Sequence, residues 1–487
     1  MFTLPFLPTV VAVFATITLF TFLTLRKHSE TSESVMVANR SVGPWLGAFA
    51  ITATWTQAPA IYASGFYAAK GPWYFVMFWA PNVLAVVLLL APVMSARRLL
   101  PQGLTAPQYM GEVFGPTVRT MTLLMQLTCL LGSSMGAILG IAQWLKPILH
   151  IEPGYVGLMF GAFAFAWVVL TGLRAGLISD RVKIACFGII IVGVAYLWWK
   201  ASGSFQAARI TPVPSEPLGN IVWNLGVPLS VTLIGAALCF PDMAERGYAI
   251  VANRSVQRSV YIGAAVMFAI VTLAFGSLGI LATHTITEKF NDFPAFAVLR
   301  TFGTPNMLVI VSVLLATILT ASLAAYIASA GNLLSIELHQ RYHLWQHGTK
   351  PDDRRTVWVS RFFMIMLIPS VVGLSNIPGI SIPKLLEWAA TFRGEILFPV
   401  LGAPVLLYFG VPTKAYDRWV GGSMIAGLLF GIVFLFSSEL FGATSLIAMN
   451  AKPLGAISAV LFPIAGFLVC RSLLHARTST ISVSATS

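Results

Sequence analysis

Hydrogen-bonding side chains gather in the middle of one apolar segment, residues 45–71. Four of them precede a proline, and the run consists of Thr52, Thr54, Thr56, Gln57 and Pro59. Proline has no N–H to donate, so a helix through this point leaves a carbonyl unpaired. Carbonyl, hydroxyl and amide oxygens are the ligands that hard cations and polar solutes need. The stretch predicts either such a binding site within an interrupted helix, or a packed helix with a proline kink whose threonines bond back to its own carbonyls.

A second apolar segment, residues 221–240, has the same character. Three residues that weaken a helix are interspersed with three polar side chains: Gly226, Pro228 and Gly235 with Asn224, Ser230 and Thr232. We expect this segment to be interrupted between residues 224 and 236. Two matching interruptions are harder to explain as simple kinks, and we predict that Thr56, Gln57 and Asn224 face one shared substrate cavity.

Charged side chains occur in or near a third apolar segment, residues 385–409, namely Glu387, Arg393 and Glu395. They are functional candidates because charges are expensive to bury in a membrane. Arg393 and Glu395 are two positions apart and point to different sides of a helix, so they are not an obvious pair. Arg393 either faces the substrate cavity, where it favours a carboxylate or another polar acceptor, or has a structural partner elsewhere.

Three histidines, His339, His343 and His347, recur every four residues, which places them on one helix face with metal-ligand spacing. They lie among Arg and Lys with no cysteine nearby, which favours a solvated or interfacial helix face over a metal site. The sequence has no paired carboxylates with catalytic spacing, no phosphate loop and no nucleophile motif. We therefore expect neither an enzyme nor a bound cofactor.

The elements that must position these residues are membrane helices. The 487 residues are 57% hydrophobic and 10% charged, whereas about a quarter of the residues of a soluble protein are charged. Apolar runs long enough to cross a bilayer number about 13. They lie roughly at 4–26, 45–69, 72–96, 119–145, 154–173, 182–202, 221–240, 259–283, 305–336, 357–376, 385–409, 419–440 and 453–470.

Basic residues predict the orientation. If the N-terminus is outside, most of the 30 Lys and Arg fall in cytoplasmic loops, so the positive-inside rule places the C-terminus in the cytoplasm of a multi-pass cell-membrane protein. The net charge of +13 is then a topology signal and not a nucleic-acid surface. The expected partners are the lipid bilayer and a small-molecule solute, with no obligate protein partner. No disulfide is expected, because the four cysteines lie in or at the ends of spans without paired spacing: Cys129, Cys186, Cys239 and Cys470.

The two interrupted segments divide the chain into two units of five spans. Because five is odd, the second unit must cross the membrane inverted, and broken helices at matching positions of inverted repeats are a plan of secondary transporters. This predicts five parts: an N-terminal extra helix and linker at 1–36, a first repeat at 37–202, an inverted second repeat at 221–410, two extra helices at 411–475 and a disordered tail at 476–487.

A single acidic residue, Asp180, lies at the mouth of a span in the run GLRAGLISDRVK. One interpretation is that Ser179 or Asp180 caps the helix that follows. The other is that Asp180 lies on the path by which an ion leaves. The two interpretations are compatible.

Several motifs together resemble the sodium/solute symporter family, which includes bacterial proline and galactose symporters, urea permeases and animal glucose cotransporters. GLRAGLISDRVK is similar to the family's turn of two glycines followed by T-D-x-x-Q, with Ser179 for Thr and Lys183 for Gln. PDMAERGYAIVANRSVQRSVYIGA resembles a family loop of which it keeps Arg246. Gly65 and Gly71 fit the glycine pattern that closes the first core helix.

The family's serine-rich helix also has a counterpart. TILTASLAAYIASAGNLLSIELHQRY aligns to it without gaps, with Ser322 at a Thr position and Glu337 at an Asp position. The likeness covers about residues 36–410. It implies an all-α polytopic membrane protein with a LeuT-type core, a 5+5 inverted repeat, one helix before the core and two after it.

The resemblance also implies a sodium site between the first and eighth core helices. Na⁺ is a hard ion that wants about five or six oxygens, which unwound carbonyls and hydroxyls supply. Carried over to this chain, the site consists of backbone carbonyls near Thr52 and Trp55, the Ile318 carbonyl, position Ala321 and the Ser322 hydroxyl. Asp180 matches a residue on the ion's cytoplasmic route. The family commonly has Ser where this chain has Ala321, so one side-chain oxygen is missing.

The sequence therefore predicts a secondary active transporter, with sodium-coupled symport of a small polar organic solute by alternating access and Na⁺ as the coupling ion. One alternative is a transporter of the same fold that works without sodium, by proton coupling or passively, as Ala321 suggests. The other is a transporter-like membrane sensor that binds a solute without moving it.

Overall fold

The computed structural model describes residues 32–149, 153–169, 173–204, 216–286, 294–375, 393–442 and 444–484, with a few positions between 8 and 19. Most of the first expected span, and Glu387 with its neighbours, lie outside these ranges. Across the described residues, nine helices are long and apolar enough to cross a membrane, and two shorter apolar helices accompany them. The chain is a multi-pass membrane protein, and the number of 13 spans stays a prediction.

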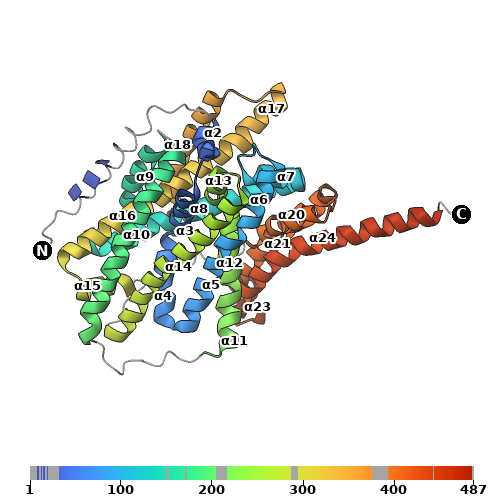
Figure 1. Ribbon diagram of the computed structural model, residues 1–487. Helices are drawn as coiled ribbons and strands as arrows, with labels where there is room; N and C mark the ends of the chain where they lie inside the picture. The colour runs from blue at the N-terminus through green and yellow to red at the C-terminus, as the bar shows by residue number, and fades with distance from the viewer. Residues whose placement is uncertain are drawn as a thin grey trace.

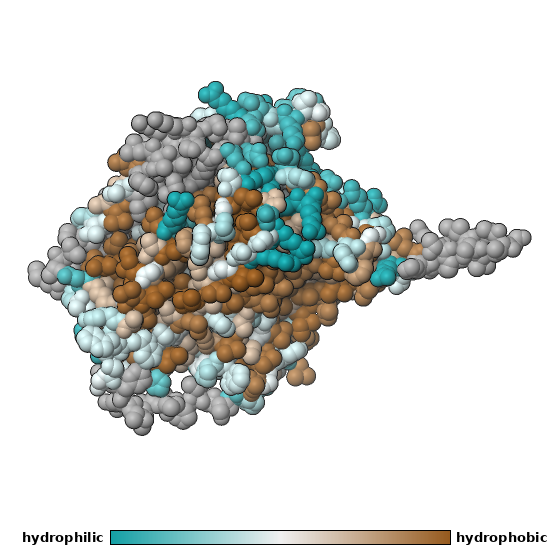
Figure 2. Space-filling view, in the orientation of Figure 1, coloured by the Kyte–Doolittle hydropathy of each residue, from teal (hydrophilic) through white to brown (hydrophobic). Residues whose placement is uncertain are grey.

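The molecule has an apolar belt between two polar ends (Figure 2). Large apolar side chains in the belt face outward, such as Val192 and Ile262 at 70% and 57% exposure, because lipid and not water covers them. Two short helices mark the ends in Figure 1, α17 (Arg341–His347) and α15 (Pro294–Phe302). We call these ends the α17 side and the α15 side.

One group of helices packs around two broken helices. The first broken helix consists of α3 and α4, the second of α12 and α13, and α5, α6 and α14 pack against them. We call these helices the first group: α3 (Pro44–Trp55), α4 (Ala58–Lys70), α5 (Pro72–Leu88), α6 (Leu90–Leu99), α12 (Val227–Cys239), α13 (Pro241–Ala249) and α14 (Arg254–Thr285). Gly71 ends α4 with φ 136°, a conformation that favours glycine.

Four other long helices pack mainly against one another and form the second group: α8 (Pro116–Leu149), α9 (Pro153–Val169), α16 (Pro305–Leu334) and α18 (Asp353–Ser375). The Trp144 indole of α8 donates to the Ser312 hydroxyl of α16 at 2.8 Å. Small residues line α8 and α16, which lets membrane helices approach closely.

Helix α10 (Leu173–Ala201) packs against both groups, contacting α3 and α14 on one side and α16 on the other. Three further helices flank the core: α20 (Leu397–Tyr408), α21 (Asp417–Leu435) and α24 (Ala451–Ser484). Helix α24 extends away from the bundle toward the C-terminus (Figure 1). Its helix is described as far as Ser484, and the disordered tail expected at 476–487 stays a prediction.

The remaining elements are short connections: α2 (Ser32–Val37), η1 (Ala38–Arg40), α7 (Ala106–Val113), η2 (Ser202–Ser204), α11 (Leu218–Ile221), η3 (Val222–Gly226), η4 (Ser335–Gln340), η5 (Gly394–Ile396), η6 (Thr413–Tyr416), α22 (Ser437–Phe441) and α23 (Leu446–Met449). An isolated parallel bridge joins Val42, just before α3, to Ile250, just after α13. The outer ends of the two broken helices therefore meet on the α17 side.

The order of elements follows the expected inverted repeat. Helix α3 begins on the α17 side and α4 ends on the α15 side, whereas α11 begins on the α15 side and α13 ends on the α17 side (Figure 1). The second broken helix thus crosses the membrane in the opposite direction to the first. The all-α inverted-repeat architecture is confirmed, while the exact boundaries of the five parts stay predictions.

Candidate transport site

The first broken helix is interrupted where the sequence predicts. Helix α3 ends at Trp55, Thr56 and Gln57 leave helical geometry with ψ 82° and 172°, and α4 begins at Ala58. The Thr52 carbonyl accepts from both the N–H and the hydroxyl of Thr56, each at 2.8 Å, which closes the last turn of α3. The helix is therefore broken and not merely kinked.

The second interruption lies later than predicted. The chain is continuously helical through residues 224–236, as the π-turn η3 and then α12, and it breaks at Phe240 with φ −73° and ψ 112°. The π-turn accommodates Pro228 at the start of α12. Gly235 serves close packing, because a Cβ there would lie 2.5 Å from the Arg393 carbonyl oxygen. The break follows instead from Pro241, which disfavours helical geometry in the residue before it.

The two breaks face one another. The Trp55 ring, at the end of α3, meets the Phe240 ring edge-on with centroids 6.1 Å apart. Phe240 also lies 5.7 Å from the Tyr326 ring of α16. The Arg393 guanidinium lies over the Phe240 ring, 5.7 Å from its centroid. These contacts gather residues from both groups at the breaks.

A cluster of buried charges lies beside this place. Asp180 of α10 accepts from Nε and Nη2 of Arg246 at 3.0 and 3.4 Å, and its carboxylate is 3.6 Å from the Lys183 ammonium. Asp242 and Glu245 belong to the same helix as Arg246, and Glu245 accepts from the Ser329 hydroxyl of α16 at 2.8 Å. All five charged side chains are at most 3% exposed: Asp180, Lys183, Asp242, Glu245 and Arg246. We call these five residues the charge cluster.

Solved structures share this architecture. A substrate-bound, outward-open Na⁺-coupled sialic acid symporter superposes with a TM-score of 0.70 at 13% identity, covering 95% of this chain and 97% of that one. The nucleobase-cation-symport-1 family transporter Mhp1 gives a TM-score of 0.56 at 17% identity, with 90% and 95% covered. A manganese transporter of Eremococcus coleocola gives 0.52 at 12% identity, with 88% and 95% covered. No family model and no curated protein matches the sequence.

The chain has the LeuT-type fold. The three solved structures are all transporters. In this LeuT-type chain, α3–α4 and α12–α13 are the two broken helices that open the repeats. At these identities the likeness extends to the fold alone.

The oxygens expected to bind sodium are largely engaged in the LeuT-type core. The Thr52 carbonyl has two donors, the Trp55 carbonyl accepts from the Gln57 N–H at 3.0 Å, and the Ile318 carbonyl accepts from the Ser322 hydroxyl at 3.1 Å. Ala321 is buried and offers no side-chain oxygen. Helices α3 and α16 are in contact, so the elements meet as expected, but a carbonyl that already holds two donors has no lone pair left for an ion.

The expected substrate residues divide into three kinds. Gln57 is buried at the first break with its amide nitrogen unpartnered, and Arg393 lies at the second break. The Thr56 hydroxyl is used within α3. Asn224 is exposed in η3, well before the second break. Asn224 is thus not brought to the second break, because the interruption lies later than expected, and its place in the substrate cavity stays a prediction.

Asp180 does not cap a helix, since α10 begins at Leu173 and passes through it. Its partner Arg246 lies in a stretch that sequence reasoning read as a cytoplasmic loop, whereas all nine residues of α13 are buried. Pro241 directly after an apolar span was the available signal for a broken helix here. Asp242 and Glu245 were missed for the same reason, because charges normally exclude a segment from the membrane, whereas Lys183 was noted only as the counterpart of a family Gln.

Other polar residues have structural roles. Glu337 accepts from the Thr105 hydroxyl at 2.5 Å and from Arg119 at 2.8 Å, which ties η4 to the start of α8. Glu395 is fully buried, and neither of its oxygens has a partner among the described residues. The His343 and His347 rings are 4.5 Å apart on the half-exposed surface of α17, in keeping with a solvated face.

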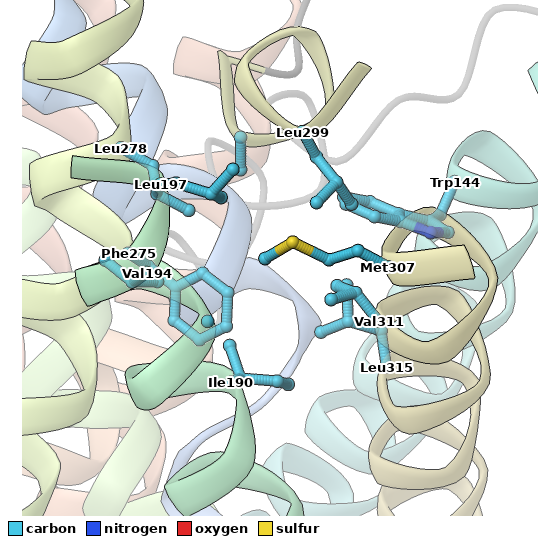
Figure 3. A pocket seen from close by; sticks show the side chains of 12 residues that line it. Trp144, Ile190, Val194, Leu197, Phe275, Leu278, Leu299, Met307, Val311 and Leu315 are labelled. Carbon is cyan, nitrogen blue, oxygen red and sulfur yellow. The ribbon is translucent and has the colours of Figure 1, made fainter. Parts of the chain in front are cut away.

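A separate, small apolar cavity of about 20 Å³ lies between α8, α10, α14, α15 and α16 (Figure 3). Ile190 and Val194 face Val311 and Leu315 across it, and the thioether of Met307 points into the space between them. Its lining offers a polar solute no hydrogen-bonding partner, which separates it in chemistry from the site at the breaks.

Proposed function

We propose that the chain is a secondary active transporter that moves a small polar organic solute by alternating access, with its N-terminus outside and its C-terminus in the cytoplasm of the cell membrane. The observation that carries the proposal is the meeting of two helices, broken at Thr56–Gln57 and at Phe240, between two groups of helices. Broken helices expose backbone N–H and C=O groups and helix ends to a ligand at mid-membrane, whereas an unbroken helix uses these groups in its own hydrogen bonds.

The chemistry around Phe240 favours an organic acid with an apolar part. The Arg393 guanidinium is 9% exposed and has no carboxylate partner among the residues described. The Tyr326 hydroxyl and the Gln57 amide nitrogen are buried without partners. A carboxylate offers acceptors to the Gln57 amide and the Tyr326 hydroxyl and a counter-charge to Arg393, and the rings of Trp55, Phe240 and Tyr326 provide apolar surface for the rest of the solute.

Two modes of coupling are candidates. The family resemblance favours sodium, bound by carbonyls near Thr52 and Trp55, the Ile318 carbonyl and the Ser322 hydroxyl. Sodium-independent transport by the same fold is favoured by Ala321, which lacks an oxygen, and by the doubly bonded Thr52 carbonyl. A different function is that of a membrane sensor that binds a solute without moving it, and only a transport assay distinguishes such a sensor from a carrier.

The test is uptake into proteoliposomes of amino acids, urea, sugars and short carboxylates, with sodium present or replaced by potassium. We expect a short carboxylate to be taken up. Uptake that requires sodium and falls in Ser322→Ala supports the sodium site, whereas uptake unaffected by both supports the sodium-independent mode. Saturable binding without uptake or exchange of any solute contradicts a carrier and supports a sensor.

A further inference from the structure

The break in α3 frees one particular carbonyl. In a continuous helix the N–H of residue 57 would donate to the carbonyl of Ala53. Here the Gln57 N–H donates to the Trp55 carbonyl instead. The Lys183 ammonium takes the vacated acceptor, with Nζ 3.3 Å from the Ala53 carbonyl oxygen. A cation is also favoured there because the end of a helix carries partial negative charge.

Lys183 thus places a positive charge next to the carbonyls that the resemblance assigns to sodium. Ala53 lies between Thr52 and Trp55 in the last turn of α3. An ammonium brings its own charge on a covalent tether and needs only acceptors for its three N–H groups, not a cage of five or six oxygens. The Ala53 carbonyl accepts one of these hydrogen bonds, and the Asp180 carboxylate forms an ion pair with the ammonium at 3.6 Å.

The charge cluster has more acids than bases. Asp180, Asp242 and Glu245 face Lys183 and Arg246, so these five residues together carry one excess negative charge when every member is ionised. Tyr326 and Cys129 also lie near Asp242, and Arg393 lies over the ring of Phe240, two positions before it. Burying such a charge is costly, and the usual outcome is that the group takes up a proton. Asp242 is the member with room for it, since one of its oxygens has no partner in the described structure while the other accepts from the Met243 N–H at 2.9 Å.

The charge cluster also connects helix α10 and helices of both groups. Lys183 reaches α3, Arg246 joins α13 to α10, and Glu245 joins α13 to α16 of the second group. Asp242 is linked to Lys183 through Arg246, which donates to the Asp242 carbonyl and to Asp180, and Asp180 lies 3.6 Å from the Lys183 ammonium. A change of charge at Asp242 therefore changes how strongly Lys183 holds the end of α3.

We propose that the charge cluster, tethered to the end of α3 by Lys183, binds the proton that drives transport, and that Lys183 fills the place of a sodium ion. This inference rests on the proposed transport function and specifies its coupling. With Asp242 protonated the cluster is neutral, and Lys183 is shared between Asp180 and the Ala53 carbonyl. When Asp242 gives its proton to water on the cytoplasmic side, a carboxylate and a hydronium ion form. The new carboxylate competes for Lys183 and weakens its bond to α3.

The test uses the full chain in proteoliposomes with the membrane potential clamped at zero. We expect an acidic exterior without sodium to accumulate the transported carboxylate, approaching about tenfold per unit of pH gradient at one proton per solute. A sodium gradient at equal pH should accumulate none. Asp242→Asn and Lys183→Met should lose pH-driven accumulation. Lys200→Met, at the exposed far end of α10, and Asp352→Asn, an exposed aspartate, are the matched controls.

A second measurement needs no solute. Infrared spectra of the purified protein at neutral pH should contain a protonated-carboxyl band from Asp242 that disappears in Asp242→Asn, while the absorption of the buried Glu395 stays, with thermal unfolding checking that the variant folds. Accumulation driven by sodium alone, or pH-driven accumulation that survives Asp242→Asn, overturns the inference and leaves the carrier standing. A wild-type protein that shows the band but exchanges no solute overturns the transport function, and the driving role with it.

Discussion

Two buried arginines near the breaks have opposite surroundings. Arg246 donates to both oxygens of Asp180 and to the Asp242 carbonyl, so its donors are used within the protein. Arg393 lies over the Phe240 ring and forms no ion pair within the described chain. Because a guanidinium in the membrane core needs acceptors, Arg393 is the one available to a ligand, while loss of Arg246 would leave Asp180 buried with only Lys183.

At the residue scale we predict that Arg393→Lys weakens binding of the transported carboxylate by about 10- to 100-fold. The lysine keeps the charge but loses the planar pair of donors, a loss of about 1.5–3 kcal/mol. The measurement is titration calorimetry with the carboxylate found in the uptake panel. Arg418→Lys, at the exposed start of α21, is the control and should bind as the wild type does. Equal affinities in both variants would remove Arg393 from the site.

The two broken helices owe their breaks to different local causes. In α3–α4, Thr56 caps the last turn by bonding back to Thr52, and Pro59 follows within the first turn of α4. In α12–α13, Pro241 restricts Phe240 directly. Pro228 has no such effect, because the wider π-turn η3 precedes it and the helix goes on. A proline therefore does not by itself mark a break in this chain, since α5, α18, α20 and α24 also continue through an internal proline.

At the element scale we predict that Pro241→Ala lowers solute uptake at least tenfold while the protein still folds. Alanine restores a donor and removes the restriction on Phe240, which allows α12 to continue and to close the backbone groups that the break exposes. Uptake in proteoliposomes and thermal unfolding in detergent are the two readouts. Pro228→Ala is the matched control and should transport normally. Pro241→Ala at the wild-type rate would mean that the break does not depend on the proline.

The two groups of helices are joined on both sides of the breaks. Toward the α15 side the Tyr62 hydroxyl of α4 donates to the Gly140 carbonyl of α8. Toward the α17 side the Ser329 hydroxyl of α16 donates to Glu245 of α13. Alternating access requires these connections to open in turn, since a carrier exposes its site to one side at a time.

At the scale of the whole molecule we predict that Tyr62→Phe favours opening toward the α15 side. Losing one hydrogen bond of about 1 kcal/mol shifts the ratio of open to closed molecules about fivefold. Distances between one spin label on α4 and one on α8 measure that ratio. Tyr408→Phe, which removes an exposed hydroxyl from α20, should leave it unchanged. An unchanged distance distribution in Tyr62→Phe would show that its hydrogen bond does not hold this side closed.

Much of the architecture could be predicted from the sequence because it depends on local properties. Hydropathy indicates the membrane helices, since lipid requires each crossing segment to be apolar along its length. The first break followed from polar residues and a proline within one short stretch. Gln57 and Arg393 were identified because a polar or charged side chain in an apolar run is conspicuous by itself.

Only the tertiary structure decided the second break, the position of Asn224 and the charge cluster. Gly235 looks like a weak point in sequence, yet its lack of a Cβ serves the approach of Arg393 from a distant segment. The sequence of α13 indicates a loop because a hydropathy scale scores each charged residue by itself and ignores the ion pairs that form in the folded protein. Arg246 and Asp180 lie on helices from different repeats. The free-energy cost of burying both charges is offset only when folding brings them to 3.0 Å from one another. Whether a charged side chain can be buried in a membrane depends on the partner that it finds, and here the partner is distant in the sequence.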